Sequence, residues 1–298
     1  MGVDLDCSFG CHDFSRPSYL CNPEKSTLRS AVQRSINLRL CFTITDVNNI
    51  VVSALLTAFL CFTVSGQTKK PEALRESRPL SQSRQIFLVI SNDWNDTAAS
   101  GRLFERKSQK NAWKQVLAPI PVVLGRNGLS PANSSISTAV QIKYEGDGKS
   151  PAGAFPLTQV FGKAKKPFGR PEYISIDEFT ECVDDPESTH YNRIVNRLKV
   201  GNFDWVSSEK MAEVTPEYDL GVFVAYNTYP VVKGRGSCIF LHIWKDAGTP
   251  TAGCTAMSRE DLENLIKNLD PEKNPYLVQL PLTEYQRFQQ KWTLPKIK

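Results

Sequence analysis

The amino-acid sequence predicts a mainly β fold, of the β-rich α+β class, for the part of the chain that begins near residue 85. Short runs of β-branched and aromatic residues follow one another there, each bounded by Gly, Pro, Asn or Asp, and such runs are typical of strands. One stretch, residues 258–269, carries a strong helix pattern with an N-cap serine and an apolar stripe. An apolar content of 41% beside 22% charged residues is that of a globular chain.

The elements of this fold can be predicted in order along the chain. Strand patterns occur at residues 86–90, 101–105, 113–116, 119–124, 218–226, 238–244 and 276–280. Pro119 and Pro121 restrict the run at 119–124 to an edge strand. Turn residues at 227–236 predict that the strands on either side form a hairpin. Residues 163–218 are a polar, insertion-like region, in which we expect a short helix at 191–199 and a loop lining the site at 207–211.

The chain of 298 residues is expected to divide into four parts. Residues 1–66 are interpreted as an N-terminal extension with a signal peptide or membrane anchor, 67–84 as a linker, 85–281 as the main domain and 282–298 as an amphipathic tail. The apolar run at 50–64 has about the length of a signal-peptide core, and Val64 and Gly66 fit a small-x-small cleavage site. A buried helix is the alternative for this run.

The charge pattern argues against a nucleic-acid partner. The net charge of +5 is modest, and no zinc-finger, helix-turn-helix or RNA-binding spacing occurs. Acidic residues gather at 177–187, but Asp184-Asp185-Pro186 is more typical of a solvated turn than of a cation site, and His190 is expected in an exposed loop. We therefore expect neither a metal nor a cofactor.

A glycine-rich segment at 146–150 has part of the pattern of a phosphate-binding loop. That loop needs a glycine five residues before its Gly-Lys-Ser step, and Lys143 occupies the position instead. The segment is therefore predicted to be a tight turn in which Gly146 and Gly148 adopt positive φ.

One histidine and one cysteine have the setting of a catalytic pair. His242 lies in the predicted strand 238–244, where alternation places Cys238, Phe240 and Trp244 on its face. Cys254 follows Gly253, which permits an unusual backbone angle or a close approach, and lies just ahead of the predicted helix. Singly, a buried cysteine or a core histidine needs no function. Together they form a nucleophile and a base.

The cysteines after residue 67 are odd in number, so at least one of them lacks an internal partner. These cysteines are Cys182, Cys238 and Cys254. If Cys254 is the nucleophile, Cys238 and Cys182 are expected to form a disulfide outside the cytoplasm.

Two segments resemble motifs of the L,D-transpeptidases, the YkuD-like family of cysteine enzymes that act on peptidoglycan stem peptides. Thr251-Ala252-Gly253-Cys254 is similar to the family's Ser/Thr-His-Gly-Cys, and residues 146–155 are similar to its Gly/Lys-Thr-Pro-x-Gly-x-Phe segment. The family's second histidine is absent, as is the Arg or Asn that commonly follows the cysteine; Thr255 and Ala256 stand there.

The resemblance implies a mixed β-sandwich with a short helix after the cysteine, Cys254 as nucleophile and His242 as general base. It further implies thioester transfer between stem peptides in the periplasm or cell envelope, with the amides of Gly253 and Cys254 holding the oxyanion. Two alternatives remain open at this point: an L,D-carboxypeptidase that trims stems, or a non-catalytic wall-binding module. The group that orients His242 is also open between Asp246 and a backbone carbonyl.

Overall fold

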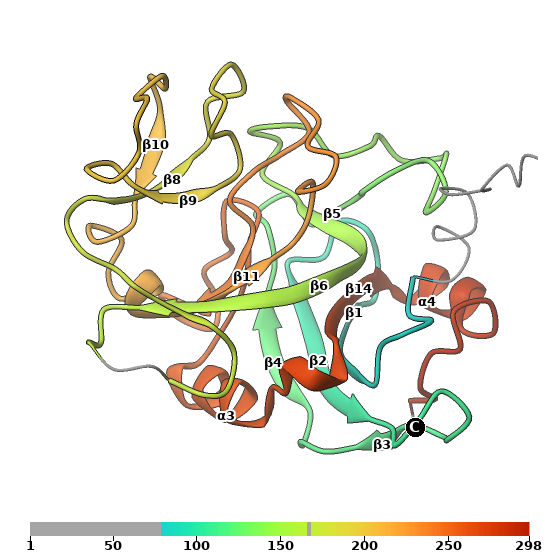
Figure 1. Cartoon of the computed structure of the whole chain (residues 1–298). Coiled ribbons are helices and arrows are strands. Elements are labelled where there is room, and N and C mark those ends of the chain that lie inside the picture. The colour runs from blue at the N-terminus through green and yellow to red at the C-terminus, as the bar shows by residue number, and fades with distance from the viewer. Residues whose placement is uncertain (1–78, 166–167, 298) are drawn as a thin grey trace, which may run out of the picture. The chain divides into compact units, whose positions relative to one another are not determined.

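The computed structural model describes residues 79–165 and 168–297 (Figure 1). The predictions for the signal peptide or anchor, for the run at 50–64 and for most of the linker lie outside these residues. Within them, an 11-stranded mixed sheet forms the body of the domain, and a separate three-stranded sheet lies beside it. The β-rich α+β prediction is therefore confirmed.

The large sheet closes on itself. Its strands follow the order β1-β14-β6-β11-β12-β13-β4-β2-β3. Strand β1 pairs with both β14 and β2, which closes the sheet and leaves β3 at the edge beside β2. Strands β5 and β7 pair with β6 off this path. The strands are β1 (Gln85–Ser91), β2 (Ala98–Glu105), β3 (Lys114–Gln115), β4 (Ile120–Val123), β5 (Leu129–Pro131), β6 (Ser150–Gly162), β7 (Tyr173–Ser175), β11 (Leu220–Val224), β12 (Phe240–Ile243), β13 (Thr255–Met257) and β14 (Pro275–Pro281).

Strands β1 and β14 run parallel through the core, with Phe87 opposite Leu277. Ile86, Phe87 and Leu88 are all fully buried, so both faces of β1 are covered. This explains why the sequence there is continuously apolar instead of alternating. Helix α4 (Leu282–Phe288) packs against this pair and buries Tyr285 and Phe288, so the segment 282–297 contributes side chains to the core.

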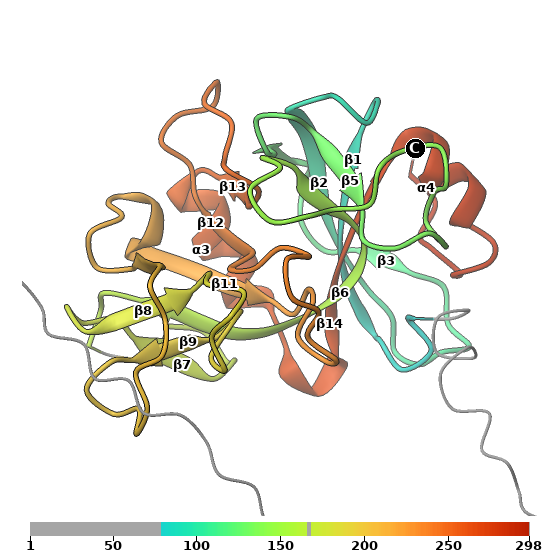
Figure 2. The ribbon, with the colours of Figure 1, turned by 90° about the horizontal axis from the view of Figure 1, so that it is seen from above.

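The polar region at 163–218 forms the small antiparallel sheet, β10-β8-β9. Figures 1 and 2 place this sheet on the opposite side of the domain from α4. The helix predicted at 191–199 is wrong: β9 (Ile194–Asn196) pairs there with β8 (Thr180–Val183), and Asn192 has a φ of 61°, which a helix cannot contain. The loop predicted at 207–211 contains a short strand, β10 (Ser208–Lys210).

Two other predictions are corrected by the sheet. Strand β4 is not an edge strand, since it lies between β2 and β13. Pro121 is tolerated because β4 meets β13 only at Val123, so Pro121 has its one strand neighbour on the β2 side. Strand β12 begins at Phe240, and Cys238 lies before it with a φ of 54°, so the face shared by Phe240 and His242 does not extend to Cys238.

The predicted hairpin is confirmed, because β11 and β12 pair antiparallel with Gly221 opposite His242. A short 3-10 turn, η1 (Glu217–Asp219), precedes β11 and takes Tyr218 out of the strand predicted at 218–226. Helix α3 (Arg259–Asn268) forms as predicted, since Ser258 Oγ accepts a hydrogen bond from Asp261 N at 3.0 Å. A second turn, η2 (Pro271–Lys273), follows it. In the described ranges, the helices are all too short or too polar to cross a membrane.

Candidate active site

The register between β12 and β13 places the thiol of Cys254 beside Phe240. These strands run parallel, with Leu241 opposite Thr255, and Cys254 is the residue just before β13. Phe240 N donates a hydrogen bond to Cys254 Sγ at 3.3 Å, and Sγ in turn donates to the carbonyl oxygen of Cys238 at 3.4 Å. The backbone on either side of Ile239 therefore holds the sulfur from two directions.

Cys254 is free and only 7% exposed, and it is the free cysteine of the part of the chain that the structure describes. Burial raises the pKa of its thiol from 9.0 to about 12, and the negative charge of Glu209 adds to this increase. Opposing contributions come from the Phe240 amide, the Lys143 cation and the Tyr218 hydroxyl. The thiol is therefore neutral in the resting protein.

His242 is buried on β12, and its Nδ1 lies 2.8 Å from the carbonyl oxygen of Ile243. Because a carbonyl only accepts, we assign the ring proton to Nδ1, which leaves Nε2 as the basic nitrogen. Burial lowers the pKa of His242 below 6.5, and the bond to Ile243 opposes this change. The orienting group is thus a backbone carbonyl, while Asp246 bonds Gly248 and Thr249 in an exposed loop.

The tyrosine of η1 connects the two predicted catalytic residues. Within the described chain no hydrogen bond joins His242 to Cys254. The ring of Tyr218 lies edge-on to that of His242, with centroids 5.5 Å apart, and its hydroxyl lowers the pKa of Cys254. The same hydroxyl donates to Glu209 Oε2 at 2.6 Å. Tyr218 and Glu209 are site residues that the sequence alone did not reveal, although residues 207–211 were expected to line the site.

A buried cation is a further site residue that the sequence did not reveal. Lys143 Nζ bonds Asp147 Oδ1 at 2.8 Å, and both side chains are almost fully buried. A Cβ placed on Gly253 would lie 3.7 Å from Lys143 Nζ and 3.1 Å from the carbonyl oxygen of Lys149. Gly253 is therefore required by close approach, and the cation lies directly beside the Gly-Cys step.

The two motif segments meet at Cys254. Ser150 Oγ, at the start of β6, donates to the carbonyl oxygen of Cys254 at 2.7 Å, and Thr251 Oγ1 donates to the same oxygen at 2.7 Å. Gly146 and Gly148 have φ values of 76° and 68°, so the predicted tight turn is confirmed. The turn places the start of β6 against the loop that carries Gly253 and Cys254.

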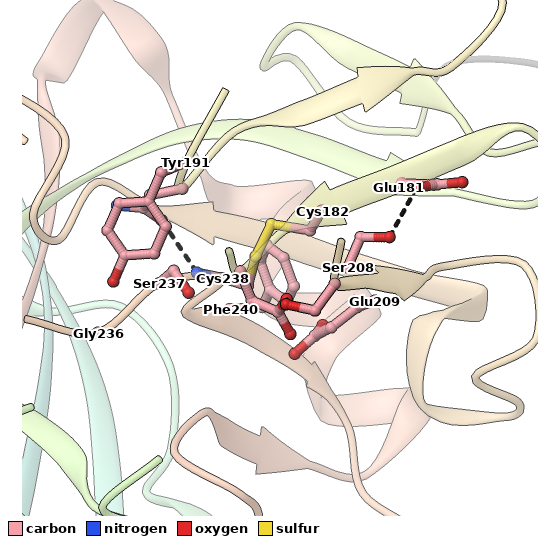
Figure 3. Close-up of a disulfide and its surroundings, with 12 residues drawn as sticks. Glu181, Cys182, Tyr191, Ser208, Glu209, Gly236, Ser237, Cys238 and Phe240 are labelled. Atoms are coloured by element: carbon pink, nitrogen blue, oxygen red, sulfur yellow. Dashed lines mark hydrogen bonds between the residues drawn. A yellow bond between two sulfur atoms is a disulfide. The ribbon is translucent and has the colours of Figure 1, made fainter. Parts of the chain in front are cut away.

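The predicted disulfide is present: Cys182 on β8 is bonded to Cys238, just ahead of β12 (Figure 3). Asn192 supports this junction, since its Oδ1 accepts a hydrogen bond from Cys238 N at 2.9 Å. The small sheet is thereby linked covalently to the segment whose carbonyl contacts the thiol. Over residues 79–165 and 168–297, no group of three or more His, Cys, Asp or Glu is placed to hold a metal ion.

The free thiol of Cys254 and the imidazole of His242, both beside Tyr218, are the side-chain types that a cysteine-dependent acyl-transfer enzyme uses as nucleophile and base. The family model for the L,D-transpeptidase catalytic domain, YkuD, matches residues 98–278, which is more than half of the chain. The chain therefore belongs to the YkuD L,D-transpeptidase family, whose members are cysteine-dependent enzymes acting on peptidoglycan.

A solved structure, that of Bd1075 from Bdellovibrio bacteriovorus, is similar at 15% sequence identity with a TM-score of 0.34. The match covers 71% of this chain and 55% of that one, so this chain spans little more than half of the length of that protein. A search of curated proteins gave no match.

Proposed function

We propose that this chain transfers an acyl group between peptidoglycan stem peptides, with Cys254 as nucleophile and His242 as general base. The observation that carries the proposal is the meeting of the two family motifs at a free thiol. Ser150, from the first motif, bonds the carbonyl of Cys254, and Phe240, from the strand of His242, bonds its sulfur.

The shifts in pKa support general-base catalysis. The pKa of Cys254 is raised and that of His242 is lowered, so a neutral thiol and a neutral imidazole are the stable resting forms. The thiolate then forms only when substrate binds and the proton moves to His242 Nε2. No hydrogen bond joins the two groups in the described chain, so they must come into contact when substrate binds, as is common for catalytic hydrogen bonds.

The reaction proceeds by two acyl transfers. Cys254 Sγ attacks the carbonyl carbon of the diamino-acid residue of the donor stem, at the peptide bond to the D-amino acid that follows, while the thiol proton passes to His242. The departing D-amino acid takes that proton on its nitrogen, and a thioester remains on Cys254. An acceptor amine then attacks the thioester carbonyl and forms the new amide bond of the cross-link as the C–S bond breaks. His242 takes the proton of the amine and returns it to the departing sulfur, which restores the neutral thiol and imidazole.

The Gly253-Cys254 step is the proposed place where the oxyanion of the substrate is stabilised. The amides of Gly253 and Cys254 are the proposed donors. Gly253 N bonds Thr251 Oγ1 at 3.1 Å in the resting chain, so this amide must exchange partners when the oxyanion forms. Lys143, which is paired with Asp147, lies beside the same step and places a cation there.

A carbapenem tests the nucleophile, because this β-lactam resembles the acyl donor of the family. The purified chain is expected to gain the mass of one carbapenem, located by digestion in the peptide 246–259, which contains Cys254 alone among cysteines. Cys254→Ala should abolish the adduct. Folded protein without an adduct, or an adduct that persists in Cys254→Ala, would favour the wall-binding alternative.

Muropeptide analysis separates the two enzymatic outcomes. Incubation with tetrapeptide stems should yield cross-linked dimers if an amine resolves the thioester. Tripeptide stems in their place would assign the chain to the trimming alternative, in which water resolves the same thioester. Both products should disappear in Cys254→Ala.

We further propose that the chain is exported to the periplasm or cell envelope. The substrate class and the Cys182–Cys238 disulfide support this proposal, because disulfides persist in oxidising compartments. Fractionation of cells that express the full chain should recover it with the envelope or periplasm. Recovery in the cytoplasm with reduced Cys182 and Cys238 would contradict the proposal.

A further inference from the structure

Strand β10 brings one carboxylate to the cluster around Cys254. Glu209 lies directly opposite Cys182 in the antiparallel pairing of β10 with β8. Cys182 is bonded to Cys238, and Figure 3 shows Glu209 close to this disulfide, on the side of Phe240. The carboxylate accepts the 2.6 Å hydrogen bond from the Tyr218 hydroxyl.

The disulfide fixes the position of this carboxylate relative to the thiol. The carbonyl of Cys238 accepts the hydrogen bond from Cys254 Sγ. One continuous set of bonds therefore leads from Glu209 across the ladder to Cys182, through the disulfide to Cys238, and on to the sulfur. Glu209 is not carried on an independent loop but on a strand anchored to the residues that hold the thiol.

The hydroxyl of Tyr218 has one proton, so it donates to one acceptor at a time. An ionised Glu209 accepts a hydrogen bond from this hydroxyl, and the 2.6 Å contact with Glu209 Oε2 matches that arrangement. A protonated Glu209 would instead donate to the tyrosine oxygen, and the tyrosine proton would then be free to point toward Cys254. The sulfur and the carboxylate therefore compete for the same donor.

The surroundings of Glu209 favour titration near neutral pH. Desolvation, helped by the charges of Asp184 and Glu145 and opposed by the hydrogen bond from the Tyr218 hydroxyl, raises the pKa of Glu209 to about 7. Lys210, its neighbour on β10, bonds Glu181 and Ser208. His242 faces the tyrosine ring from β12.

We propose that Glu209 is a positioning residue for the nucleophile: through Tyr218, its protonation state determines whether the tyrosine hydroxyl donates to Cys254. This inference rests on the proposed function, in which Cys254 attacks the substrate. A protonated Glu209 leaves the hydroxyl to stabilise the thiolate, and an ionised Glu209 withdraws the hydroxyl and adds a repulsive charge.

The predicted signature is a shoulder in the pH profile of thiol alkylation. Thiolate formation alone increases the rate about tenfold for each pH unit below the thiol pKa. In the native chain the rate should rise less steeply around pH 7, where Glu209 ionises. Glu209→Gln keeps a donor toward Tyr218 and cannot ionise, so its shoulder should vanish and its rate at about pH 8 should exceed the native rate roughly tenfold.

The experiment uses the full chain with iodoacetamide pulses between about pH 5.5 and 8.5, followed by digestion and quantification of the peptide 246–259. Glu213→Gln is the matched control, because Glu213 is an exposed carboxylate four positions after Glu209 and should retain the native profile. Tyr218→Phe removes the connection and should lower the rate at about pH 6 several-fold relative to native.

A native profile without a shoulder, or a shoulder that persists in Glu209→Gln, would overturn the inference. The carbapenem adduct is measured on the same proteins and reports on the proposed function separately. A shoulder without an adduct would reject the transpeptidase proposal alone, and an adduct without a shoulder would reject only the role of Glu209.

Discussion

At the scale of the residue, the catalytic proposal depends on how burial changes two titrating groups in opposite directions. Burial disfavours charge, so it raises the pKa of the Cys254 thiol and lowers that of the His242 imidazole. A cysteine and a histidine in this state exchange a proton only during attack. The sequence predicted both residues, but the depth of burial is a property of the folded chain.

The lowered pKa of His242 predicts the pH at which activity declines on the acidic side. Only the neutral imidazole accepts a proton, and a pKa below 6.5 keeps that form populated at more acidic pH. The rate of carbapenem acylation should therefore reach half of its plateau below pH 6.5. Measuring Glu209→Gln alongside the native chain removes the contribution of that carboxylate, and a midpoint above 6.5 in both would contradict the assignment of His242 as the base.

The Lys143–Asp147 pair makes a second prediction at this scale. Lys143→Met leaves Asp147 as a buried, uncompensated charge and should destabilise the fold by about 3–5 kcal/mol in urea unfolding. The double variant Lys143→Met/Asp147→Asn should recover most of this loss. It should nevertheless acylate roughly tenfold more slowly, because the cation beside the thiol is absent. A native acylation rate in the double variant would show that Lys143 is structural only.

At the scale of the element, one disulfide joins β8 to the residue two positions ahead of β12, and β10 is held beside β8 by strand pairing. The Cys182–Cys238 disulfide joins two residues whose separation in the sequence is 56, and so closes a long loop. It also explains why the small sheet, which the sequence presented only as a polar insertion, contributes a carboxylate to the site. The Cys182–Cys238 disulfide was expected from the sequence, although the three cysteines after residue 67 allow three pairings. Nothing in the sequence indicated that Glu209 lies opposite Cys182.

Removal of this disulfide should destabilise the domain. The free energy of unfolding in urea is expected to be about 4 kcal/mol lower in the double variant Cys182→Ala/Cys238→Ala. Without the cross-link the unfolded chain gains conformational entropy, and a loop of this length gives a change of that size. Cys254→Ala removes a sulfur without opening the loop and should cost much less. Equal losses in the two variants would mean that the link does not restrain the small sheet.

At the scale of the whole molecule, the described domain depends on contacts between its two ends. Strand β1 pairs with β14 along its full length, and α4 covers this pair. The chain after β14 buries four large side chains: Tyr285, Phe288, Trp292 and Leu294. The tail predicted from residue 282 onward is therefore part of the core that supports the site.

Truncation after residue 281 should accordingly unfold the domain. Each of the four buried side chains contributes about 1.5–3 kcal/mol, and their sum approaches the whole stability of an ordinary domain, about 5–15 kcal/mol. The truncated chain should lose its cooperative urea transition, whereas Gln286→Ala, an exposed change on α4, should stay within about 0.5 kcal/mol of native. A cooperative transition in the truncated chain would show that the domain ends at β14.

The sequence by itself determined the features that depend on neighbouring residues. The strand of His242, the turn at Gly146 and Gly148, the Gly253-Cys254 step and the helix capped by Ser258 all follow from alternation, glycine and capping, which act within a few positions. The helix predicted at 191–199 failed because pairing with β8 outweighed local helix propensity.

Only the tertiary structure decided which groups surround the sulfur. Lys143, Glu209 and Tyr218 come from three separate segments of the chain, and no spacing in the sequence relates them to Cys254. Their effect depends on distance and on exclusion of water, and both arise when the closed sheet and the disulfide bring these segments together. The sequence therefore predicted the two residues of the proposed chemistry, and the fold determines the environment that shifts their pKa values.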